Sequence, residues 1–209
     1  QLTNLNRNKL FDDNPENSKI PDALKKEFIV ETGSAYGVDF SAKYNKKQLS
    51  VSLVYSWSYV DRWDGALRYN PIWDRRHNIN FLTSYLFGED QVWSFDARLN
   101  IGSGFPLTQT TGFYENINLQ GDIGQDITTQ NGDLGIQYGR LGDGRLPWYH
   151  RFDVSLKRKF FISESSVLQT TASITNVYNR ENVFYVNRVT NDRVNQLPFL
   201  PSVGVSLTF

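Results

Sequence analysis

The sequence has no cysteine and no methionine among its 209 residues. Without cysteine it can form no disulfide framework and offers no thiolate ligand for a metal. An excess of one charge is also lacking, because 22 Lys and Arg balance 22 Asp and Glu and no long block of like charge occurs. A nucleic-acid-binding protein usually carries a basic surface, so the balanced charge argues against nucleic acid as a partner.

Long hydrophobic runs are absent as well. Mean hydropathy is -0.47, and without a run of roughly 18 apolar residues no transmembrane helix is predicted. A transmembrane β-strand needs only about 9–11 residues with one apolar face, so average hydropathy does not reveal it. Aromatic residues reach 14%, which suits either the edges of a membrane or a surface that binds sugars or peptides. The chain starts at Gln1 without a signal peptide, which predicts a fragment or a processed product of something longer.

Apolar and polar side chains alternate in the last residues of the chain. Within 201–209, Val, Leu and Phe alternate with Gly, Ser and Thr, and the chain stops on Phe209. A period of two predicts a β-strand with one apolar face. A final strand that ends on Phe is typical of barrels in bacterial outer membranes, so we interpret Phe209 as a terminal signal for barrel assembly.

Six earlier segments alternate in the same way. In Leu49–Val60, the clearest, Leu, Val, Tyr and Trp occupy one face and mostly Ser the other. Its length exceeds the ordinary strand of about 5–6 residues and matches a tilted membrane span. Lys26–Thr32 keeps the parity of the first strand and could extend it. The predicted strands are 36–44, 49–60, 75–86, 92–101, 148–161, 167–175 and 201–209.

The connections between these strands are alternately short and long. The short ones are 45–48, 87–91 and 162–166, and the long ones are 61–74, 103–148 and 178–200. Outer-membrane barrels have short periplasmic turns and long extracellular loops, whereas soluble sandwiches rarely alternate so strictly. The predicted fold is therefore all-β, a transmembrane antiparallel β-barrel in a bacterial outer membrane.

Placing Phe209 in the periplasm sets the direction of every strand, and aromatic residues then fall at both membrane edges, as a girdle should. The periplasmic group is Tyr44, Tyr85, Trp93 and Phe160, and the outer group is Tyr36, Trp57 and Tyr59. Residues 1–32 are interpreted as an extracellular loop with a strand extension, and 33–209 as the barrel part. Bacterial barrels have an even number of strands, so the missing strands are expected on another piece of polypeptide.

Several motifs resemble the late barrel strands of TonB-dependent receptors from Bacteroidetes, over nearly all of the chain from Gly33 to Phe209. They are Gly33–Phe40, Leu53–Ser58, Tyr69–Asn80, Gly102–Pro106, Leu146–Asp153 and Asn176–Asn182. The resemblance implies a barrel of about 22 strands, a number within the range of such proteins, of which this chain carries the last seven. It also implies a separate plug domain, and uptake of a scarce extracellular ligand driven through TonB by the proton gradient. Siderophores, glycans and peptides are the candidate ligands.

The resemblance further implies the partners of the chain. These are the remaining strands and the plug of the same receptor, TonB through the missing N-terminal part, outer-membrane lipid and, as a further expectation, a surface lipoprotein. Two rival readings stay open. One is a porin or a structural barrel subunit of a larger envelope complex, and the other is a soluble β-sandwich that binds ligands.

Aromatic side chains in the connection 103–148 are candidates for ligand contact. Aromatic platforms suit sugars or peptides, and loops on a rigid scaffold often carry binding function, although packing of the loop on itself explains them equally well. The candidates facing the ligand are Phe113, Tyr114, Tyr138 and Trp148, with Phe105 in the same connection.

Arginines gather near the predicted outer rim. They could hold an anionic ligand with paired hydrogen bonds, but a network of salt bridges is the favoured explanation. The candidate rim cations are Arg75, Arg76 and Arg151, with Arg140 and Arg145 nearby. Charges on the lumen face are expected to pair with each other or with the plug. These are Asp39, Lys43, Asp96, Arg98, Asp153, Lys157 and Lys159.

No pattern supports a metal, a cofactor or catalysis. His77 and His150 lack the spacing of paired metal ligands and are expected to be rim residues paired to carboxylates or backbone. Asp122, Asp126 and Asp133 do not follow the calcium-loop pattern. No nucleophile, base and orienting group can be assembled, so we expect a protein that is not an enzyme.

Overall fold

The structure of the chain, a computed structural model, describes residues 2–4, 29–116, 133–163 and 165–209. The predicted all-β, antiparallel class is confirmed. A single turn of 3₁₀-helix, η4 (Glu89–Gln91), interrupts the strands. The strands are β1 (Leu2–Asn4), β2 (Ile29–Lys46), β3 (Leu49–Trp63), β4 (Arg68–Tyr69), β5 (His77–Phe87), β6 (Trp93–Gly102), β7 (Pro106–Leu107), β8 (Thr110–Asn116), β9 (Asp133–Tyr138), β10 (Gly144–Arg145), β11 (Tyr149–Phe161), β12 (Val167–Thr175), β13 (Val183–Val186), β14 (Arg193–Asn195) and β15 (Leu200–Thr208).

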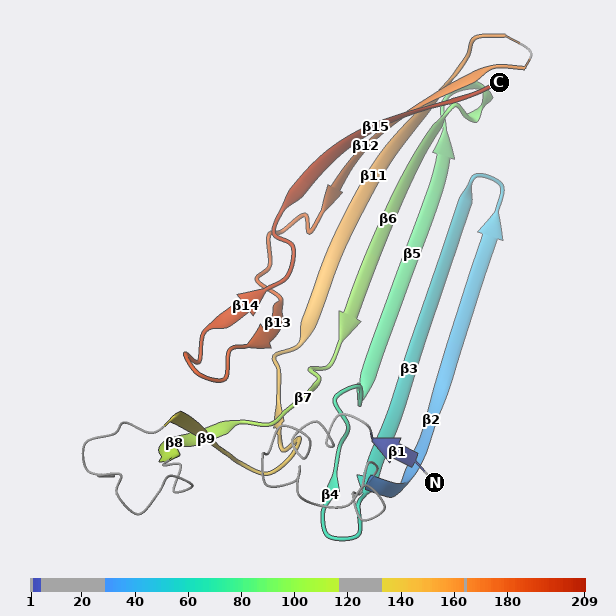
Figure 1. The fold of residues 1–209 in the computed structure, drawn as a ribbon. Helices are drawn as coiled ribbons and strands as arrows, with labels where there is room; N and C mark the ends of the chain where they lie inside the picture. The colour runs from blue at the N-terminus through green and yellow to red at the C-terminus, as the bar shows by residue number, and fades with distance from the viewer. Residues whose placement is uncertain (1, 5–28, 117–132, 164) are drawn as a thin grey trace, which may run out of the picture.

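One sheet contains all seven predicted strands, in the order β1-β2-β3-β5-β6-β11-β12-β15, with β4 on the end of β3 (Figure 1). Every neighbouring pair is antiparallel, so the chain meanders from one border to the other. The predicted extension of the first strand is confirmed for 29–32, and 26–28 lie outside the described residues. β1 and β15 end this order, but β1 pairs only with Ile29–Glu31, so the rest of β2 forms the border on that side. Within the described residues β2 and β15 do not pair with each other.

The short connections lie at one end of the sheet and the long connections at the other (Figure 1). The short turns and the C-terminus lie at one end, called the turn end below. The connections 64–76 and 176–199 and the described parts of 103–148 lie at the other, called the loop end. Lys47, in the two-residue turn between β2 and β3, has the positive φ of 49° that such tight hairpins require.

The long connections contain short strands that the sequence did not predict. β8 pairs with β9, β7 with β10, and β13 with β14, each as a separate two-stranded ladder. Within 1–32, which the sequence analysis interprets as a loop with a strand extension, the short strand β1 pairs with Ile29–Glu31 of β2. β7 and β10 have two residues each, too few to show alternation. In β9, by contrast, Leu134, Ile136 and Tyr138 alternate with small or polar residues, so a sequence signal for this strand exists.

The register aligns apolar side chains with apolar side chains across the whole sheet. One row runs Ala42, Leu53, Phe81, Leu99 and Phe152, each residue directly opposite the next on the neighbouring strand. Polar residues occupy the positions between these rows, because successive side chains point to opposite faces. A slip of one residue would reverse both faces, so this agreement on every strand specifies the register.

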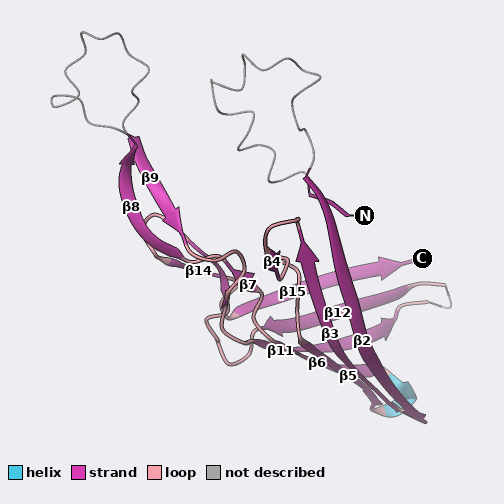
Figure 2. Ribbon diagram, turned by 90° about the horizontal axis from the view of Figure 1, so that it is seen from below, coloured by secondary structure: helices cyan, strands magenta, loops and turns pink. Residues whose placement is uncertain are grey.

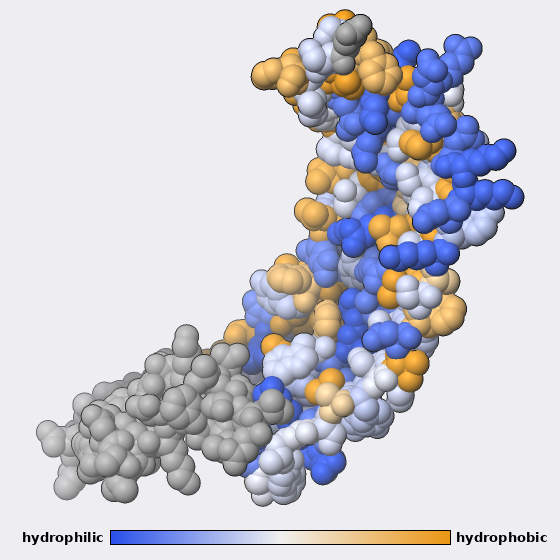
Figure 3. All heavy atoms as spheres, turned by 90° about the vertical axis from the view of Figure 1, so that its right-hand side faces the viewer, coloured by the Kyte–Doolittle hydropathy of each residue, from blue (hydrophilic) through white to orange (hydrophobic). Residues whose placement is uncertain are grey.

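The apolar face has no second layer upon it within the described part of the chain. Phe40 on β2 is 55% exposed and Val203 on β15 is 83% exposed, while Tyr69 and Ala97 are the buried hydrophobic residues of that part. Hydrophobic side chains appear at the surface at many heights along the molecule (Figure 3). A contiguous apolar surface of this kind marks a site of contact with protein or membrane.

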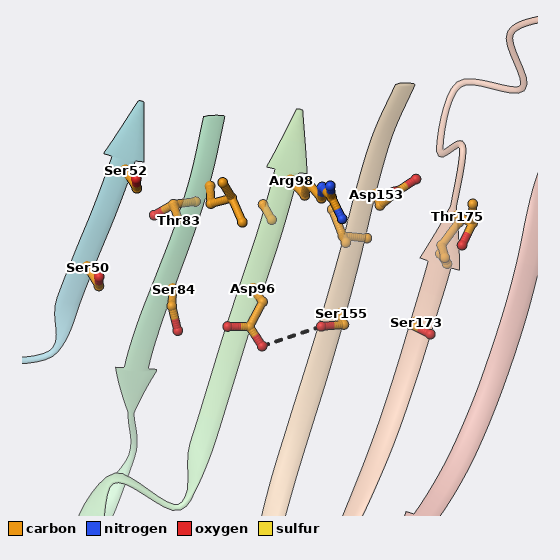
Figure 4. A pocket seen from close by; sticks show the side chains of 14 residues that line it. Ser50, Ser52, Thr83, Ser84, Asp96, Arg98, Asp153, Ser155, Ser173 and Thr175 are labelled. Atoms are coloured by element: carbon orange, nitrogen blue, oxygen red, sulfur yellow. Dashed lines mark hydrogen bonds between the residues drawn. The ribbon is translucent and has the colours of Figure 1, made fainter. Parts of the chain in front are cut away.

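Strand direction rotates strongly from β2 and β3 to β12 and β15, so the sheet is twisted and curved (Figure 2). A hollow of about 400 Å³ lies against it, lined largely by polar-face residues of β3, β5, β6, β11 and β12. Figure 4 shows Asp96 and Ser155 bridging β6 and β11 within this hollow, with Ser155 Oγ donating to Asp96 Oδ2 over 3.4 Å. No helix in the described residues is long and apolar enough to cross a membrane.

Candidate functional site

The buried side chains at the loop end are mostly polar or charged, whereas the apolar face of the sheet is exposed. Glu31, Asp74 and Asn176 are the largest fully buried side chains among the described residues. Burying a carboxylate costs several kcal/mol unless it is paired and hydrogen-bonded, so each of these groups must have partners. The networks around them fix the long connections against the strand ends.

Asp74 is the centre of the first network and joins two connections to the end of β3. Its Oδ2 accepts from Arg76 Nε at 3.0 Å and from Arg145 Nη2, while its Oδ1 accepts the backbone N–H of Val60 at 3.1 Å. Arg145 Nη1 also donates to the backbone carbonyls of Asp74 (3.0 Å) and Gly104 (3.1 Å). Two guanidinium groups thus share one carboxylate, which leaves a surplus of one positive charge here.

Glu31 forms a second buried network on the β2 side. Its two carboxylate oxygens accept from Arg62 Nη1 at 3.1 Å and from the Tyr69 hydroxyl at 2.7 Å. The Arg62 guanidinium also lies over the Trp73 ring, 4.6 Å from its centroid. The short strand β4 is thereby held against the end of β3.

Asparagine side chains form the third network by replacing backbone partners. Asn182 pairs with both backbone groups of His150, accepting from its N–H at 3.1 Å and donating to its carbonyl at 2.9 Å. Asn176, at a positive φ of 56°, donates to the carbonyls of Arg180 and Leu197. The connection between β12 and β15 therefore follows a defined path beside β11.

Tyr178 and His150 meet in the same region, with His150 Nδ1 2.7 Å from the Tyr178 hydroxyl oxygen. Burial raises the pKa of the Tyr178 hydroxyl, so that side chain stays neutral over the whole physiological range. Among the described residues, no three His, Cys, Asp or Glu side chains lie close enough together to hold a metal ion. Asp122 and Asp126 lie outside the described residues, as does the side chain of Asp133.

The candidate rim cations have partners within the chain. Arg76 binds Asp74, and Arg151 Nε lies 3.0 Å from Asp153 Oδ2. Arg75 Nε donates to the Ser103 carbonyl at 3.2 Å, and its guanidinium lies over the Phe105 ring at 4.4 Å. Burial lowers the pKa of Arg75, although a guanidinium remains charged at any ordinary pH. Arg76 and Arg151 are thus in salt bridges, whereas Arg75 contacts a backbone carbonyl and an aromatic ring.

Charges of the polar face pair in part with each other, as expected. Lys157 Nζ lies 2.9 Å from Asp96 Oδ2, in addition to the Arg151–Asp153 pair. Asp39 and Lys43, on the border strand β2, make no ion pair within the described part of the chain. Partly exposed pairs such as these contribute at most about 1 kcal/mol each to folding stability. Their main effect is to make this face of the sheet polar.

The candidate ligand-facing aromatics lie in two different places. Phe113, Tyr114 and Tyr138 are exposed on the β8–β9 hairpin, which projects from the loop end (Figures 1 and 2). Trp148 instead stacks on His77, with ring centroids 5.8 Å apart. His77 belongs to the apolar face, where its Nδ1 is 3.0 Å from the Tyr55 hydroxyl. The connection 103–148 therefore does not gather these four rings into one platform.

The predicted girdle residues cluster at the two ends of the sheet. Tyr36 stacks on Tyr59 with centroids 5.1 Å apart and meets Trp57 edge to face at the loop end of β2 and β3. At the turn end, the guanidinium of Arg158 lies over the rings of Trp93 (4.9 Å) and Phe160 (4.5 Å). Arg158 interrupts the apolar pattern of β11, and these rings explain how its charge is accommodated. Tyr44 and Tyr85 are exposed on the same apolar face, and Phe209 extends beyond β15.

Two adjoining hollows at the loop end contain residues that the sequence did not single out. The first, about 470 Å³ and called the cationic hollow below, is lined by Arg145, Arg188 and Arg193 among polar and apolar residues. The second, about 310 Å³ and called the aromatic hollow, includes Phe184 and Tyr185. No sequence signal could have found them, because connections far apart in the chain meet there.

Comparison with protein-family models, with curated proteins and with solved structures found no match.

Proposed function

We propose that this chain forms the last seven strands of a TonB-dependent outer-membrane transporter. The observation that carries the proposal is the exposed apolar face, which runs across the long strands of a single-layer sheet in one register and is interrupted at Arg158. In water such a face would be covered by a second sheet or by helices. Lipid is the covering that suits strands with one continuous apolar face and one polar face.

Three further features support the membrane assignment. The strands of 9–18 residues are long enough for a tilted span. Aromatic side chains group at both ends of the apolar face, where membrane interfaces would lie. All short turns share the end that carries Phe209, which corresponds to the periplasmic side of such barrels.

The free borders of the sheet support a larger assembly. β15 carries Val203 and Val205 on an unpaired border, and an exposed, flat, apolar border strand is prone to aggregation. Closing the sheet with further strands of the same receptor would satisfy both borders. The polar hollow along the opposite face would then lie within the barrel, where its charges and hydroxyls could contact a plug.

The test is the behaviour of the full-length protein that contains this chain. We expect it in the outer-membrane fraction and, in a planar bilayer, we expect no steady ion conductance, because a plug would fill the barrel. Recovery as a detergent-free monodisperse monomer would contradict the membrane assignment. A steady open-channel conductance would favour the porin alternative, and so would a precursor without a plug and a TonB-binding segment.

A further inference from the structure

The cationic hollow is built from two small ladders that belong to different connections. One wall comes from β7, β10 and the residues around them, and the other from the β13–β14 hairpin. The hydroxyl of Thr110 donates to the Arg188 carbonyl at 3.0 Å, which ties the two walls together. The hollow is therefore a defined feature of the loop end.

Its charge is of one sign. Among the described residues, Arg145, Arg188 and Arg193 line it and no acidic side chain does. Arg145 shares Asp74 with a second arginine, so that carboxylate does not neutralise both cations. Arg188 lies over the Tyr138 ring at 5.4 Å, and neither it nor Arg193 has an ion-pair partner in the described part of the chain. Several guanidinium groups facing one space without carboxylates are suited to an anion.

The aromatic hollow continues the same space. The two hollows share Leu107, Thr108, Leu146 and Arg188 in their linings. Phe105, Phe184 and Tyr185 supply aromatic surface in the second hollow. Together the volumes fall within the range of about 300–1,000 Å³ that is usual for small-molecule sites. A ligand that spans both hollows would meet cations at one end and aromatic surface at the other.

We infer that the loop end binds a small organic anion. Its carboxylate or phosphate group would lie among Arg145, Arg188 and Arg193, and its apolar or aromatic part would lie in the aromatic hollow. A guanidinium group can bind either a carboxylate or a phosphate through two parallel hydrogen bonds, so the site would recognise the anionic group in both cases. The inference rests on the proposed function only in that the loop end would face the exterior and meet such ligands there.

The test is calorimetric titration of the full-length protein with four probes. These are 1-naphthoate, 1-naphthyl phosphate, neutral 1-naphthalenemethanol and inorganic phosphate. We expect the two aryl anions to bind at least about tenfold more tightly than the neutral probe, and inorganic phosphate to bind less tightly than its naphthyl ester. The ratio between the two aryl anions distinguishes a carboxylate site from a phosphate site. Added salt should weaken binding of both anions.

Variants locate the binding. Arg188→Gln and Arg193→Gln should each weaken binding of the aryl anions by about tenfold, and Arg68→Gln should leave it unchanged. Arg68 is a matched control because it is an exposed arginine at the loop end that lies outside both hollows, where it pairs with the buried Asp61. Circular dichroism of each variant shows that the β-structure is retained.

The inference would be overturned by equal affinity for the neutral probe, by unchanged titrations of both arginine variants, or by the absence of binding to a folded protein. Failure here is separable from failure of the proposed function. A protein found in the outer membrane that shows no preference for anions refutes only the inference. Binding that depends on Arg188 in a protein absent from the outer membrane refutes only the transporter assignment.

Discussion

Replacing Leu53 by Arg tests the assignment of the apolar face. Leu53 lies between Ala42 and Phe81 in the middle of an apolar row. It is four residues from Leu49 and four from Trp57 on β3. Leu49 begins β3 at the turn end, and Trp57 belongs to the predicted girdle at the loop end. With a rise of about 3.3 Å per residue and a strand tilt of about 45°, Leu53 would lie roughly 9 Å from each of these two residues along the membrane normal, and therefore near the bilayer midplane.

An arginine on the lipid face at that depth costs about 2–4 kcal/mol of folding free energy. The folding equilibrium constant should therefore fall about 30- to 700-fold. The assay is reversible unfolding of the full-length protein in lipid vesicles by guanidinium chloride, followed by tryptophan fluorescence.

Val54→Arg is the matched control. Val54 is the next residue of the same strand at nearly the same depth, but it lies on the polar face opposite Ser41 and Asn80. We expect Val54→Arg to cost less than about 1 kcal/mol, because a polar lumen would solvate the charge. A cost near zero for Leu53→Arg, or a larger cost for Val54→Arg, would refute the assignment of the faces.

Two other predictions concern the loop end and the border strand. Asp74→Asn removes the carboxylate that two guanidinium groups share, and should cost about 2–4 kcal/mol in the same unfolding assay. Arg68→Gln removes an exposed arginine from its pair with the buried Asp61 but keeps a hydrogen-bond donor at that position, so it should cost less than Asp74→Asn. A similar cost for both would contradict the network. Gly104→Ala should prevent native pairing of β7 with β10, because the new methyl group would overlap the Leu146 carbonyl, whereas Gly204→Ala meets open space and should be tolerated. Hydrogen exchange of the backbone amides in β7, β10 and β15 is the measurement. Normal protection of the β7 and β10 amides in Gly104→Ala would contradict the close approach of Gly104 to the Leu146 carbonyl.

The strands were predictable because each face of a β-strand repeats with a period of two over nine residues or more. The predicted bounds of the border strand differed most, since β2 reaches Ile29 at the loop end, where 26–32 had been considered only an extension. Alternation fails locally at Arg158, and its position over two aromatic rings could not be inferred from spacing alone.

The loop end was less predictable because its contacts join residues distant in sequence. Arg76 and Arg145 were recognised as rim arginines, but their common partner Asp74 was not. The role of Arg188 and Arg193 in the cationic hollow was not predictable, because nothing in their local sequence indicates a hollow shared with β7 and β10. Side-chain networks and small ladders of this kind follow from tertiary contacts, whereas strand faces follow from local pattern.

The most direct test of the membrane account is chemical labelling of single cysteines introduced into the chain. The chain has no cysteine of its own, so no native thiol within it would react with the label. Lys47→Cys places a thiol in the turn between β2 and β3, and Arg68→Cys places one in an exposed side chain at the loop end. On intact cells, a membrane-impermeant maleimide should label the Arg68→Cys variant and leave the Lys47→Cys variant unlabelled until the outer membrane is permeabilised. Labelling of both variants on intact cells, or of Lys47→Cys alone, would contradict a sheet that crosses the outer membrane with its long connections outside.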